Sequence, residues 1–305
     1  MIRGFRMDLA DLIVRHTHRE GVHVSRIPRL DLVRISGATG PVHSMHEQAV
    51  VFVAKGSKRV VIGENTFTNA ADQFLIVSVE VPVIGEVTDA TPAEPYLCMR
   101  LHLNVAVLRE LIIEAELENE VTTHRLSLGL GLGTVTPELF AAATRLVALL
   151  DTPRDIKVLA PMAEREILYR LLVSNQAKRL LQIARPHSKL SQVNKAIDFI
   201  KRNFDKPLRM SDVARKAGMS ASALNQHFKA ATAMSPLQYQ KHVRLQTARR
   251  LIFTESVDAA AAANRVGYES PSQFSREYRR LFGAPPIRDL VMHSVLPPSA
   301  MRRTD

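Results

Sequence analysis

The sequence contains one helical unit twice, and this repeat limits what the last third of the chain can fold into. The first copy reads KAGMSASALNQHFKAATAMSPLQYQ from Lys216, and the second reads RVGYESPSQFSREYRRLFGAPP from Arg265. Each copy has a small residue, a glycine, a serine-containing turn and then a helix with an aromatic residue near its end. This pattern predicts a short helix, a tight turn and a second helix, which together form a helix-turn-helix.

The two copies correspond position by position. Ala263, Gly267, Phe274 and Tyr278 follow Ala214, Gly218, Leu224 and Phe228 at offsets of 49, 49, 50 and 50 residues. The alanine is small because the second helix crosses close above it, and the glycine permits the turn. We expect Ser211 to cap the first helix of the first unit, and Ser220 or Ser222 to begin the second.

The segment between the units, SPLQYQKHVRLQTARRLIF, reads as one helix with Ser235 as N-cap and Pro236 at its first position. From Pro236 to Phe253 it spans about 27 Å at 1.5 Å per residue. Two reading helices held about this far apart suit successive major grooves, which are roughly 34 Å apart on one face of DNA. The repeat therefore indicates a chain that reads two half-sites, although an ordinary helical bundle has similar local patterns.

The distribution of charge supports a polyanionic partner for this region. Residues 1–186 carry 21 Lys and Arg against 21 Asp and Glu, whereas residues 187–305 carry 20 against 9. The whole net charge of +11 therefore belongs to the last third of the chain. A basic region beside a neutral one is typical of a nucleic-acid-binding protein, although a basic surface also serves solubility.

The N-terminal part has a different pattern. Residues 30–103 alternate short Val- and Ile-rich runs with Gly, Asn and Pro, which predicts a small antiparallel barrel or sandwich. Helical periodicity begins near Asn104, continues in a helix capped by Thr136, and includes a third helix over 160–184. The predicted organisation is therefore a barrel over 1–104, a helical packing or dimerisation segment over 105–184, a linker over 185–190, and a DNA-binding domain over 191–297.

Several classes of protein are disfavoured. The chain has no run of eighteen apolar residues, and its N-terminal apolar patch, Leu9 to Val14, contains no continuous signal-peptide core. The single cysteine, Cys98, excludes an internal disulfide framework. We therefore expect a cytoplasmic protein with no membrane partner.

The C-terminal motifs resemble the DNA-binding domain of the AraC/XylS family of bacterial transcription regulators. The resemblance covers about residues 195–290, through SPLQYQKHVRLQTARRLI and VGYESPSQFSREYRRLFGAPP. PVHSMHEQAVVFVAKGSKRVVIG and DQFLIVSVEVPVIGEV resemble the cupin-like effector domain of one AraC subfamily. The implied fold is α+β, with a cupin-like β-barrel plus helices and an all-α domain with two helix-turn-helix units joined by a long helix.

The sequence departs from this family at three places. Gln226 stands where Arg is common, so base preference there is expected to differ. Pro285 replaces a usual Ser, and IRDL follows it where a Tyr-Arg pair is frequent. We expect the last two changes to affect packing of the domain more than recognition of DNA bases.

The reading residues follow from helical periodicity. In the first reading helix Leu224 and Phe228 point inward, and in the second Phe274 and Tyr278 do so. Asn and Gln can bond adenine with two contacts, and Arg matches the O6 and N7 of guanine, so Arg276 is the strongest candidate. Lys229, Arg279 and Arg280 suit phosphates. The full predicted set is Ser222, Asn225, Gln226, Lys229, Ser272, Gln273, Ser275, Arg276, Arg279 and Arg280.

A candidate effector site lies in the N-terminal half. In PYLCMRLHL a strand places Tyr96, Cys98, Arg100 and His102 on one face, which would line the cavity of a barrel. His43 and His46 of PVHSMHE are expected to line a pocket or cap a loop. Arg100 is expected to lower the pKa of the Cys98 thiol, which raises the hypothesis that Cys98 senses electrophiles. The alternative is that Cys98 is a small buried hydrophobic residue, which is the usual role of a lone cysteine.

The sequence gives weaker support to a metal site or a dinucleotide-binding site. His43, His46 and Glu47 crowd together as metal ligands do, yet a catalytic cupin needs another histidine on a later strand, and a two-residue gap does not suit two inward positions of one strand. We predict no metal and no cofactor. The glycines of SLGLGLGTVTPEL do not have the spacing of a dinucleotide loop, so the segment is interpreted as a flexible connector between helices.

The leading hypothesis is a regulator that binds double-stranded promoter DNA and a small-molecule effector, acts through RNA polymerase and forms a possible homodimer. The alternatives are a metal-dependent cupin enzyme with a DNA-binding tail and an architectural DNA binder without an effector.

Overall fold

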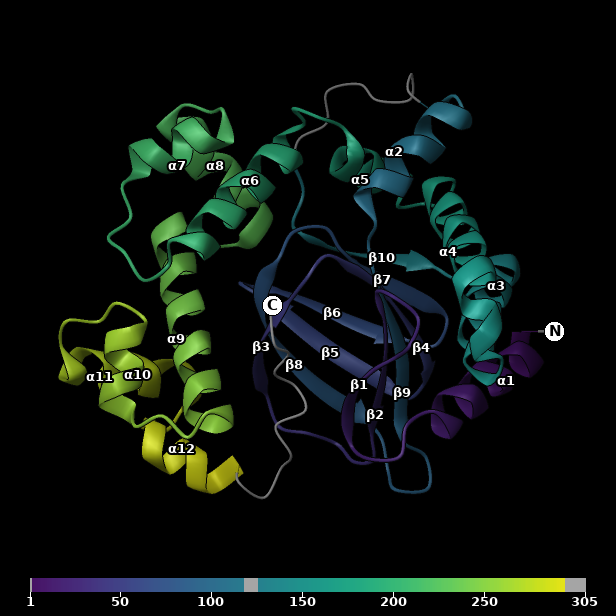
Figure 1. Cartoon of the computed structure of the whole chain (residues 1–305), viewed down its shortest axis with the longest axis horizontal. Helices are drawn as coiled ribbons and strands as arrows, with labels where there is room; N and C mark the ends of the chain where they lie inside the picture. The colour runs from purple at the N-terminus through teal and green to yellow at the C-terminus, as the bar shows by residue number, and fades with distance from the viewer. Residues whose placement is uncertain (1, 118–125, 294–305) are drawn as a thin grey trace.

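The computed structural model of the protein describes residues 2–117 and 126–293, with side chains from residue 9 to residue 291. The chain has the predicted α+β architecture: strands form the centre, and helices surround them on three sides (Figure 1). The two helix-turn-helix units lie together at one side, and helices α1, α3 and α4 lie at the other.

The described strands form two antiparallel sheets. The six-stranded sheet has the order β1 (Gly21–Val24), β2 (Leu30–Ile35), β9 (Tyr96–His102), β4 (Ala49–Lys55), β7 (Gln73–Val77) and β10 (Leu130–Thr134). The four-stranded sheet has the order β3 (Val42–His46), β8 (Val81–Asp89), β5 (Ser57–Ile62) and β6 (Asn65–Ala70). The Asn69 amide of β6 donates to the Val51 carbonyl of β4, so the sheets face each other.

Alternation along β9 decides which side chains enter the space between the sheets. Leu97, Met99 and Leu101 are almost completely buried on the outer face, and helix α1 (Ile2–Arg15) packs on this side against β2, β4 and β9. The opposite face carries Tyr96, Cys98, Arg100 and His102, because successive strand residues point to opposite sides. The polar face of β9 therefore looks into the interior, as the alternation predicts.

Helices continue outward from this sheet in layers. Helix α3 (Pro137–Ala148) packs against α1 and against α4 (Ile156–Leu172), which in turn contacts α2 (Val105–Glu114) and α5 (Ala177–Ala184). The Thr136 hydroxyl caps α3 by accepting from the Leu139 amide, and Pro137 is at its first position. The third helix expected over 160–184 is two helices, because 173–176 interrupts it.

The glycine-rich segment SLGLGLG contains a strand, and its interpretation as a flexible connector was wrong. Leu130–Thr134 forms β10, which pairs with β7 at the edge of the larger sheet. A Cβ atom at Gly133 would lie 2.1 Å from the Phe74 ring, and one at Gly131 would lie 2.6 Å from the Gln176 side chain. Glycine at 133 is required by the close approach of the Phe74 ring, which periodicity alone does not reveal.

The C-terminal part is entirely helical in the described residues. It contains α6 (Lys189–Arg202), α7 (Met210–Ala217), α8 (Ala221–Thr232), α9 (Pro236–Thr254), α10 (Ala259–Arg265), α11 (Pro271–Phe282) and α12 (Pro286–His293). Pairs α7–α8 and α10–α11 are the two helix-turn-helix units, and α9 is the predicted spacer. The predicted domain end at 297 lies outside the described residues.

Local capping explains most of these boundaries. Ser220 caps α8, Ser270 caps α11, and Ser235 forms a capping box with Gln238 at the start of α9. The expectation for Ser211 was wrong, since α7 begins at Met210 after Arg209 and Ser211 lies inside the helix. The helix therefore starts before the position that a Ser211 cap would set.

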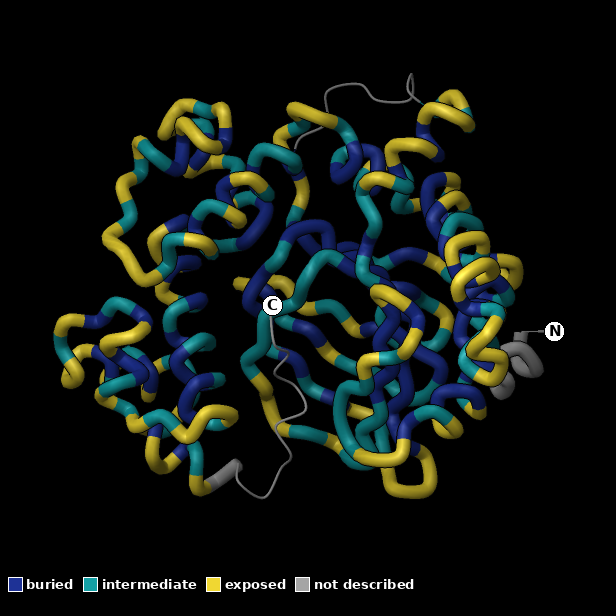
Figure 2. Tube along the Cα trace, in the orientation of Figure 1, coloured by how far each residue is buried: buried dark blue, intermediate teal, exposed yellow. Residues whose placement is uncertain are grey.

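Buried apolar residues form two clusters, and their division does not follow the predicted linker. The larger cluster joins the sheets, helices α1 to α6 and the first helix-turn-helix unit, including Leu224 and Phe228. The smaller one contains the second unit and the C-terminal half of α9, from Leu245 to Ile252. Figure 2 shows buried residues in both units and along α9. The first unit thus shares its core with the N-terminal half.

Gly267→Ala is expected to unfold the second unit far more readily than Gly283→Ala. Both glycines have φ near +84°, but a Cβ at Gly267 would lie 1.9 Å from the Asp205 carbonyl oxygen, whereas nothing lies within 4 Å at Gly283. Gly283→Ala should cost about 1 kcal/mol for backbone conformation alone, and Gly267→Ala at least about 3 kcal/mol. Urea unfolding measures both, and equal losses would contradict this account.

Candidate DNA-binding surface and candidate effector site

The first reading helix, α8, presents a polar face to solvent. Leu224 and Phe228 are completely buried, and Phe228 packs edge-on against Tyr239 of α9. The predicted residues on the opposite face, Ser222, Asn225, Gln226 and Lys229, are all exposed. In the described residues none of these four has an ion pair or side-chain hydrogen bond, so their polar groups are available to a partner.

The second reading helix, α11, repeats this arrangement. Phe274 and Tyr278 are buried in an aromatic stack with Tyr268 and Phe282. Exposed on the other face are Ser272, Gln273, Arg276, Arg279 and Arg280, while Ser275 is half-buried. The Gln273 amide donates to Glu277 on the same helix at 3.3 Å. Arg276 therefore stands out as an accessible guanidinium at the middle of this face.

Helix α9 clamps the backbone turns beside it. The Arg244 guanidinium donates to the carbonyl oxygens of Phe204 (2.6 Å) and Gly267 (2.9 Å), and its central carbon lies 5.7 Å from the Tyr268 ring centre. The Gln240 amide donates to the Phe204 and Lys206 carbonyls. These bonds connect the end of α6 with the turn of the second unit, so α9 orients both.

A buried ion pair fixes the second reading helix on α9. Arg249 donates to Asp289 of α12 at 2.9 and 3.2 Å, and the Tyr278 hydroxyl donates to the same carboxylate at 2.7 Å. The Arg249 guanidinium also lies 4.7 Å from the Phe282 ring centre. Asp289 belongs to the IRDL sequence, so its departure from the family pattern bears on packing, as expected.

The N-terminal half contacts both units near the ends of their reading helices. The Gly129 amide donates to the Ala231 carbonyl of α8 at 2.7 Å, and Lys201 of α6 pairs with Glu80 at 2.5 Å. On the second unit, the His43 ring packs edge-on against Phe282 at 5.9 Å. Burial, with His43 and Lys241 adding to it, lowers the pKa of His242 on α9 to about 4. The neutral forms of these histidines suit this interface.

His43 and His46 lie on opposite faces of β3. His46 pairs with Val81 and Ser44 with Val83, and both valines are buried inside, so His46 faces the interior. His43 faces outward to Phe282. The structure therefore separates His43 from the other predicted effector residues and brings it to the contact with α11.

The interior between the sheets collects the remaining predicted residues. His46 enters from one sheet, and Tyr96, Cys98, Arg100 and His102 enter from the other. Burial, followed by the charges of Lys58 and Arg100, lowers the pKa of His46 well below its usual value.

Sequence reasoning missed two interior residues. Lys58 of β5 pairs across the sheet with Asn69 of β6, so their side chains share the inner face. The Asn69 side-chain oxygen is buried without a hydrogen-bond partner, and no ion pair of Lys58 occurs in the described residues. Burial lowers the pKa of the Lys58 ammonium, while the nearby Cys98 raises it. Inward alternation with Val60 and Ile62 was the signal that could have found Lys58.

Other interior charges are already paired. Asp31 accepts from Arg100 at 2.7 Å and from His102 at 3.0 Å, and the second ring nitrogen of His102 lies 3.2 Å from Glu47. No group of three His, Cys, Asp or Glu side chains in the described residues is arranged to hold a metal ion. Of the cluster that prompted the metal alternative, His43 and His46 are divided between the two faces of β3.

The expected activation of Cys98 was wrong. Burial raises the pKa of its thiol, and this effect exceeds the lowering by Tyr96, Lys58 and Arg100. Cys98 is 3% exposed. A buried thiol with a raised pKa is mostly protonated near neutral pH, so the arrangement favours a packing role over the reactive sensor.

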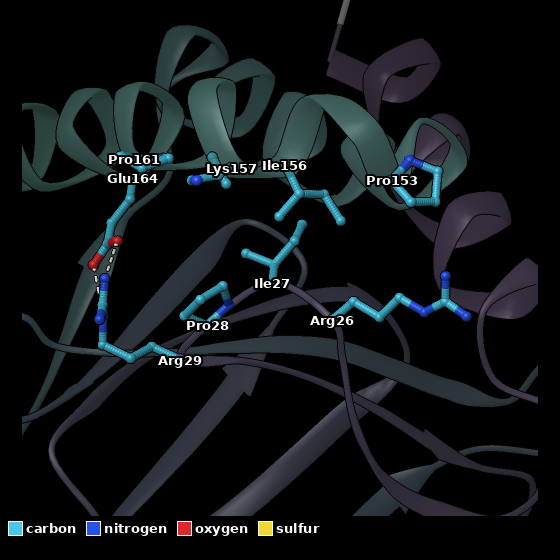
Figure 3. Close-up of a pocket in the computed structure, with 10 residues that line it drawn as sticks. Arg26, Ile27, Pro28, Arg29, Pro153, Ile156, Lys157, Pro161 and Glu164 are labelled. Atoms are coloured by element: carbon cyan, nitrogen blue, oxygen red, sulfur yellow. Dashed lines mark hydrogen bonds and ion pairs between the residues drawn. The ribbon is translucent and has the colours of Figure 1, made fainter.

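A pocket lies outside the sheets. A pocket of about 420 Å³ opens between the β1–β2 connection and α4 (Figure 3). Ile27 of the connection and Ile156 of α4 point toward each other across it, Ala160, Arg26 and Lys157 also line it, and Arg29 lies at one side in an ion pair with Glu164 at 2.5 Å. None of the predicted effector residues lines it.

Comparison with known families identifies the chain. The family described as AraC-type transcriptional regulator N-terminus matches residues 26–179, and a helix-turn-helix domain family matches residues 213–289. The chain belongs to the AraC family of transcriptional regulators. The predicted family resemblance is thereby confirmed.

Curated relatives of this family align over part of their length. The transcriptional regulator ArgR of Pseudomonas aeruginosa is 26% identical over 147 residues, which is 47% of this chain and 44% of ArgR. The transcriptional activator RhaS of Escherichia coli is 28% identical over 146 residues, covering 48% of this chain and 52% of RhaS. The chain thus spans about half the length of the curated relatives it matches.

Solved structures resemble the whole described fold. Apo ToxT K231A from Vibrio cholerae strain SCE256 covers 90% of this chain and 99% of its own, with a TM-score of 0.57 and 12% identity. A ToxT structure with unsaturated fatty acid bound has a TM-score of 0.54 and 14% identity over 90% of this chain and 97% of its own. These likenesses show the shared fold.

Membrane insertion finds no support in the helices. Among the helices of residues 2–117 and 126–293, none combines the length and the apolar character that a bilayer span requires.

Asp289→Ala is expected to destabilise the protein by about 3 to 5 kcal/mol, because it leaves the buried Arg249 charge without its carboxylate. Asp212→Ala is the matched control: Asp212 pairs with Arg215, whose side chain is 75% exposed, and such a pair contributes at most about 1 kcal/mol. Urea unfolding compares the two variants. Similar losses in both would show that the Arg249–Asp289 pair does not hold α12 in place.

Proposed function

We propose that this chain is a cytoplasmic, sequence-specific DNA-binding transcriptional regulator that responds to a small molecule held between its two sheets. The observation that carries the DNA part is the pair of exposed polar faces on α8 and α11, both fixed to one continuous helix of 19 residues. At 1.5 Å per residue this helix is about 28 Å long, which suits two half-sites about one helical turn apart.

Each reading helix is assigned a role from its chemistry. Asn225 and Gln226 of α8 would bond adenine edges, and Arg276 of α11 would bond guanine. The cationic residues toward the ends of the helices, Lys229, Arg279 and Arg280, would contact phosphates. Gln273 would be released from Glu277 on binding. The further base or sugar contacts of the same faces are Ser222, Ser272, Gln273 and Ser275.

The ligand of the interior is proposed to be a small organic acid that also carries a hydrogen-bond donor. An anionic group would supply the partner that Lys58 lacks among the described residues, and a donor would satisfy the buried Asn69 oxygen. His46, Tyr96 and Cys98 border this position, while Arg100 and His102 are held by Asp31. The fatty acid in one ToxT structure is also a carboxylic acid.

Promoter binding would act through RNA polymerase, and the chain would function as a homodimer. Relatives described as a transcriptional regulator and a transcriptional activator support action at a promoter. The relatives give no support to the alternative of a cupin enzyme with a DNA-binding tail.

Substitutions of base-reading residues and of phosphate-contacting residues should have different effects on DNA binding. On a site selected from random DNA, Gln226→Ala and Arg276→Ala should each weaken binding by about 1 to 3 kcal/mol and relax preference in different halves of the site. Lys229→Ala should weaken binding to all DNA sequences alike and reduce the slope of log affinity against log salt concentration by about one. Fluorescence anisotropy at several salt concentrations measures this. Equal binding of wild type to every sequence would refute the proposal.

Lys58→Met should abolish stabilisation by acidic ligands. In thermal shift assays with small hydroxycarboxylates and the corresponding uncharged alcohols, wild type should be stabilised by one or more acids, by about 2.7 kcal/mol at one hundred times Kd. Lys55→Met is the control, because Lys55 pairs with Glu94 at the surface. An acid that stabilises Lys58→Met as much as wild type does not bind at Lys58, and the interior assignment then fails.

A further inference from the structure

The Lys58 side chain lies on the inner face of the four-stranded sheet. It alternates with Val60 and Ile62, whose side chains are almost completely buried, and it is itself half-buried, so solvent still reaches it. A Cβ atom at Gly85 of β8 would lie 2.8 Å from Cε and 3.2 Å from Nζ of Lys58. The amine therefore lies above the backbone of β8, and within the described ranges no carboxylate pairs with it.

Arg100 enters the same interior from the six-stranded sheet. Lys58 is paired with Asn69 on β6, and the Asn69 amide donates to the Val51 carbonyl of β4 at 3.4 Å. Val51 in turn is paired with Arg100, so these contacts place Arg100 and Lys58 at the same level of the interior. Arg100 donates to Asp31 through Nε and Nη2. Its Nη1 atom has no hydrogen bond to residues 2–117 or 126–293, so it is a donor available to a ligand.

Burial gives the Lys58 amine the character of a nucleophile. It lowers the pKa of the ammonium, while Cys98 raises this pKa and Arg100 lowers it further. A larger fraction of Lys58 is therefore an uncharged amine near neutral pH than is the case for a lysine in water. An uncharged lysine amine adds to aldehydes and ketones, and desolvated lysines form Schiff bases with carbonyl substrates.

We propose that Lys58 captures its ligand covalently, as a Schiff base with the carbonyl carbon of a small oxo acid whose carboxylate binds Nη1 of Arg100. This inference rests on the ligand site between the sheets that the proposed function describes, and it narrows the organic acid to one with an aldehyde or ketone group. The protonated Schiff base keeps a positive charge beside the carboxylate. Its N–H supplies the donor that the buried Asn69 oxygen lacks.

The reaction exchanges a carbonyl oxygen for the Lys58 nitrogen and needs no oxidant or reductant. The Nζ lone pair forms a C–N bond to the carbonyl carbon, the amine loses a proton, and the carbonyl oxygen takes one. The nitrogen lone pair then forms the second C–N bond as the C–O bond breaks, and the oxygen leaves as water. The protons exchange with solvent, which reaches the half-buried side chain. Addition of water reverses every step, so the captured ligand is released when its concentration falls.

The Cys98 thiol faces the same interior and is the competing nucleophile. Burial raises its pKa, which lowers the fraction of reactive thiolate. For Lys58 burial has the opposite consequence, because it favours the uncharged and nucleophilic form of an amine. Hydride reduction distinguishes the two adducts, since it converts a Schiff base into a stable secondary amine and leaves a thiol adduct reversible.

Reductive trapping on the full chain tests the proposal, with glyoxylate, the smallest oxo acid, as the probe. The protein is equilibrated with limiting glyoxylate, reduced briefly with borohydride and mapped by peptide mass spectrometry. A Schiff base is thereby fixed as a carboxymethyl group on Nζ. Lys58 should be modified severalfold more than Lys55, which pairs with Glu94 at the surface.

Two comparisons test the separate parts of the site. Glycolaldehyde has a hydroxymethyl group where glyoxylate has its carboxylate, so it should modify Lys58 severalfold less than glyoxylate does. Lys58→Arg keeps a positive charge but has no amine that condenses with a carbonyl group. Wild type and Lys55→Arg should keep a raised melting temperature after trapping and removal of free glyoxylate, and Lys58→Arg should not.

Equal modification of Lys58 and Lys55 in wild type, or no modification of Lys58, would overturn the proposal whether or not the variants fold. Equal modification of Lys58 by glyoxylate and glycolaldehyde would reject the carboxylate contact with Arg100. Stabilisation by hydroxycarboxylates without trapping at Lys58 would retain the acid site of the proposed function and reject the covalent step. Trapping at Lys58 without such stabilisation would support covalent capture and contradict the non-covalent acid site.

Discussion

Helix α9 is the constraint on which the DNA-binding half depends, because its two ends belong to different cores. Tyr239 and Val243 at its beginning pack with the first unit and the N-terminal half, whereas Leu245 to Ile252 pack with the second unit. Arg244 and Arg249 then fix the second unit through backbone carbonyls and Asp289. A continuous helix with buried residues at both ends holds two reading helices at one separation.

This division of cores also indicates how a ligand in the interior would influence DNA binding. The first unit is joined to the N-terminal half by the Gly129–Ala231 contact, and the neighbouring helix α6 by the Glu80–Lys201 pair, while the second unit touches it through Phe282 and His43. His43 and His46 lie on opposite faces of the same short strand, β3. A ligand that moves β3 would therefore change the support of α11, provided that it binds one arrangement better than the other.

Much of this architecture was predictable from sequence because it depends on local patterns. The repeat, the capping residues Ser220 and Ser235, and the alternation in β9 each depend on neighbours within a few residues. The predictions that failed depend on distant contacts. Gly131 and Gly133 lie in a strand where Phe74 and Gln176 approach them closely, and the Cys98 pKa is raised because both sheets bury it.

The same difference between local patterns and distant contacts explains which residues of the candidate sites were predicted from the sequence. The reading faces of α8 and α11 follow from helical periodicity, although their contact with bases stays a prediction. Lys58 and Asn69 were missed because only the pairing of β5 with β6 reveals that both face the interior. The sequence predicted that the segment containing Asp289 affects packing, but it did not reveal the partner of Asp289, because Arg249 is 40 residues away.

The most direct test of the central claim, that α9 sets a fixed distance between two readers, is binding to a selected site with base pairs inserted between its two motifs. The account predicts that insertions of about five and about ten base pairs, half a helical turn and a full one, both reduce affinity to that of a single motif, because a rigid helix cannot follow either change. Unchanged affinity for the full-turn insertion would contradict it, and would mean that the two units move independently.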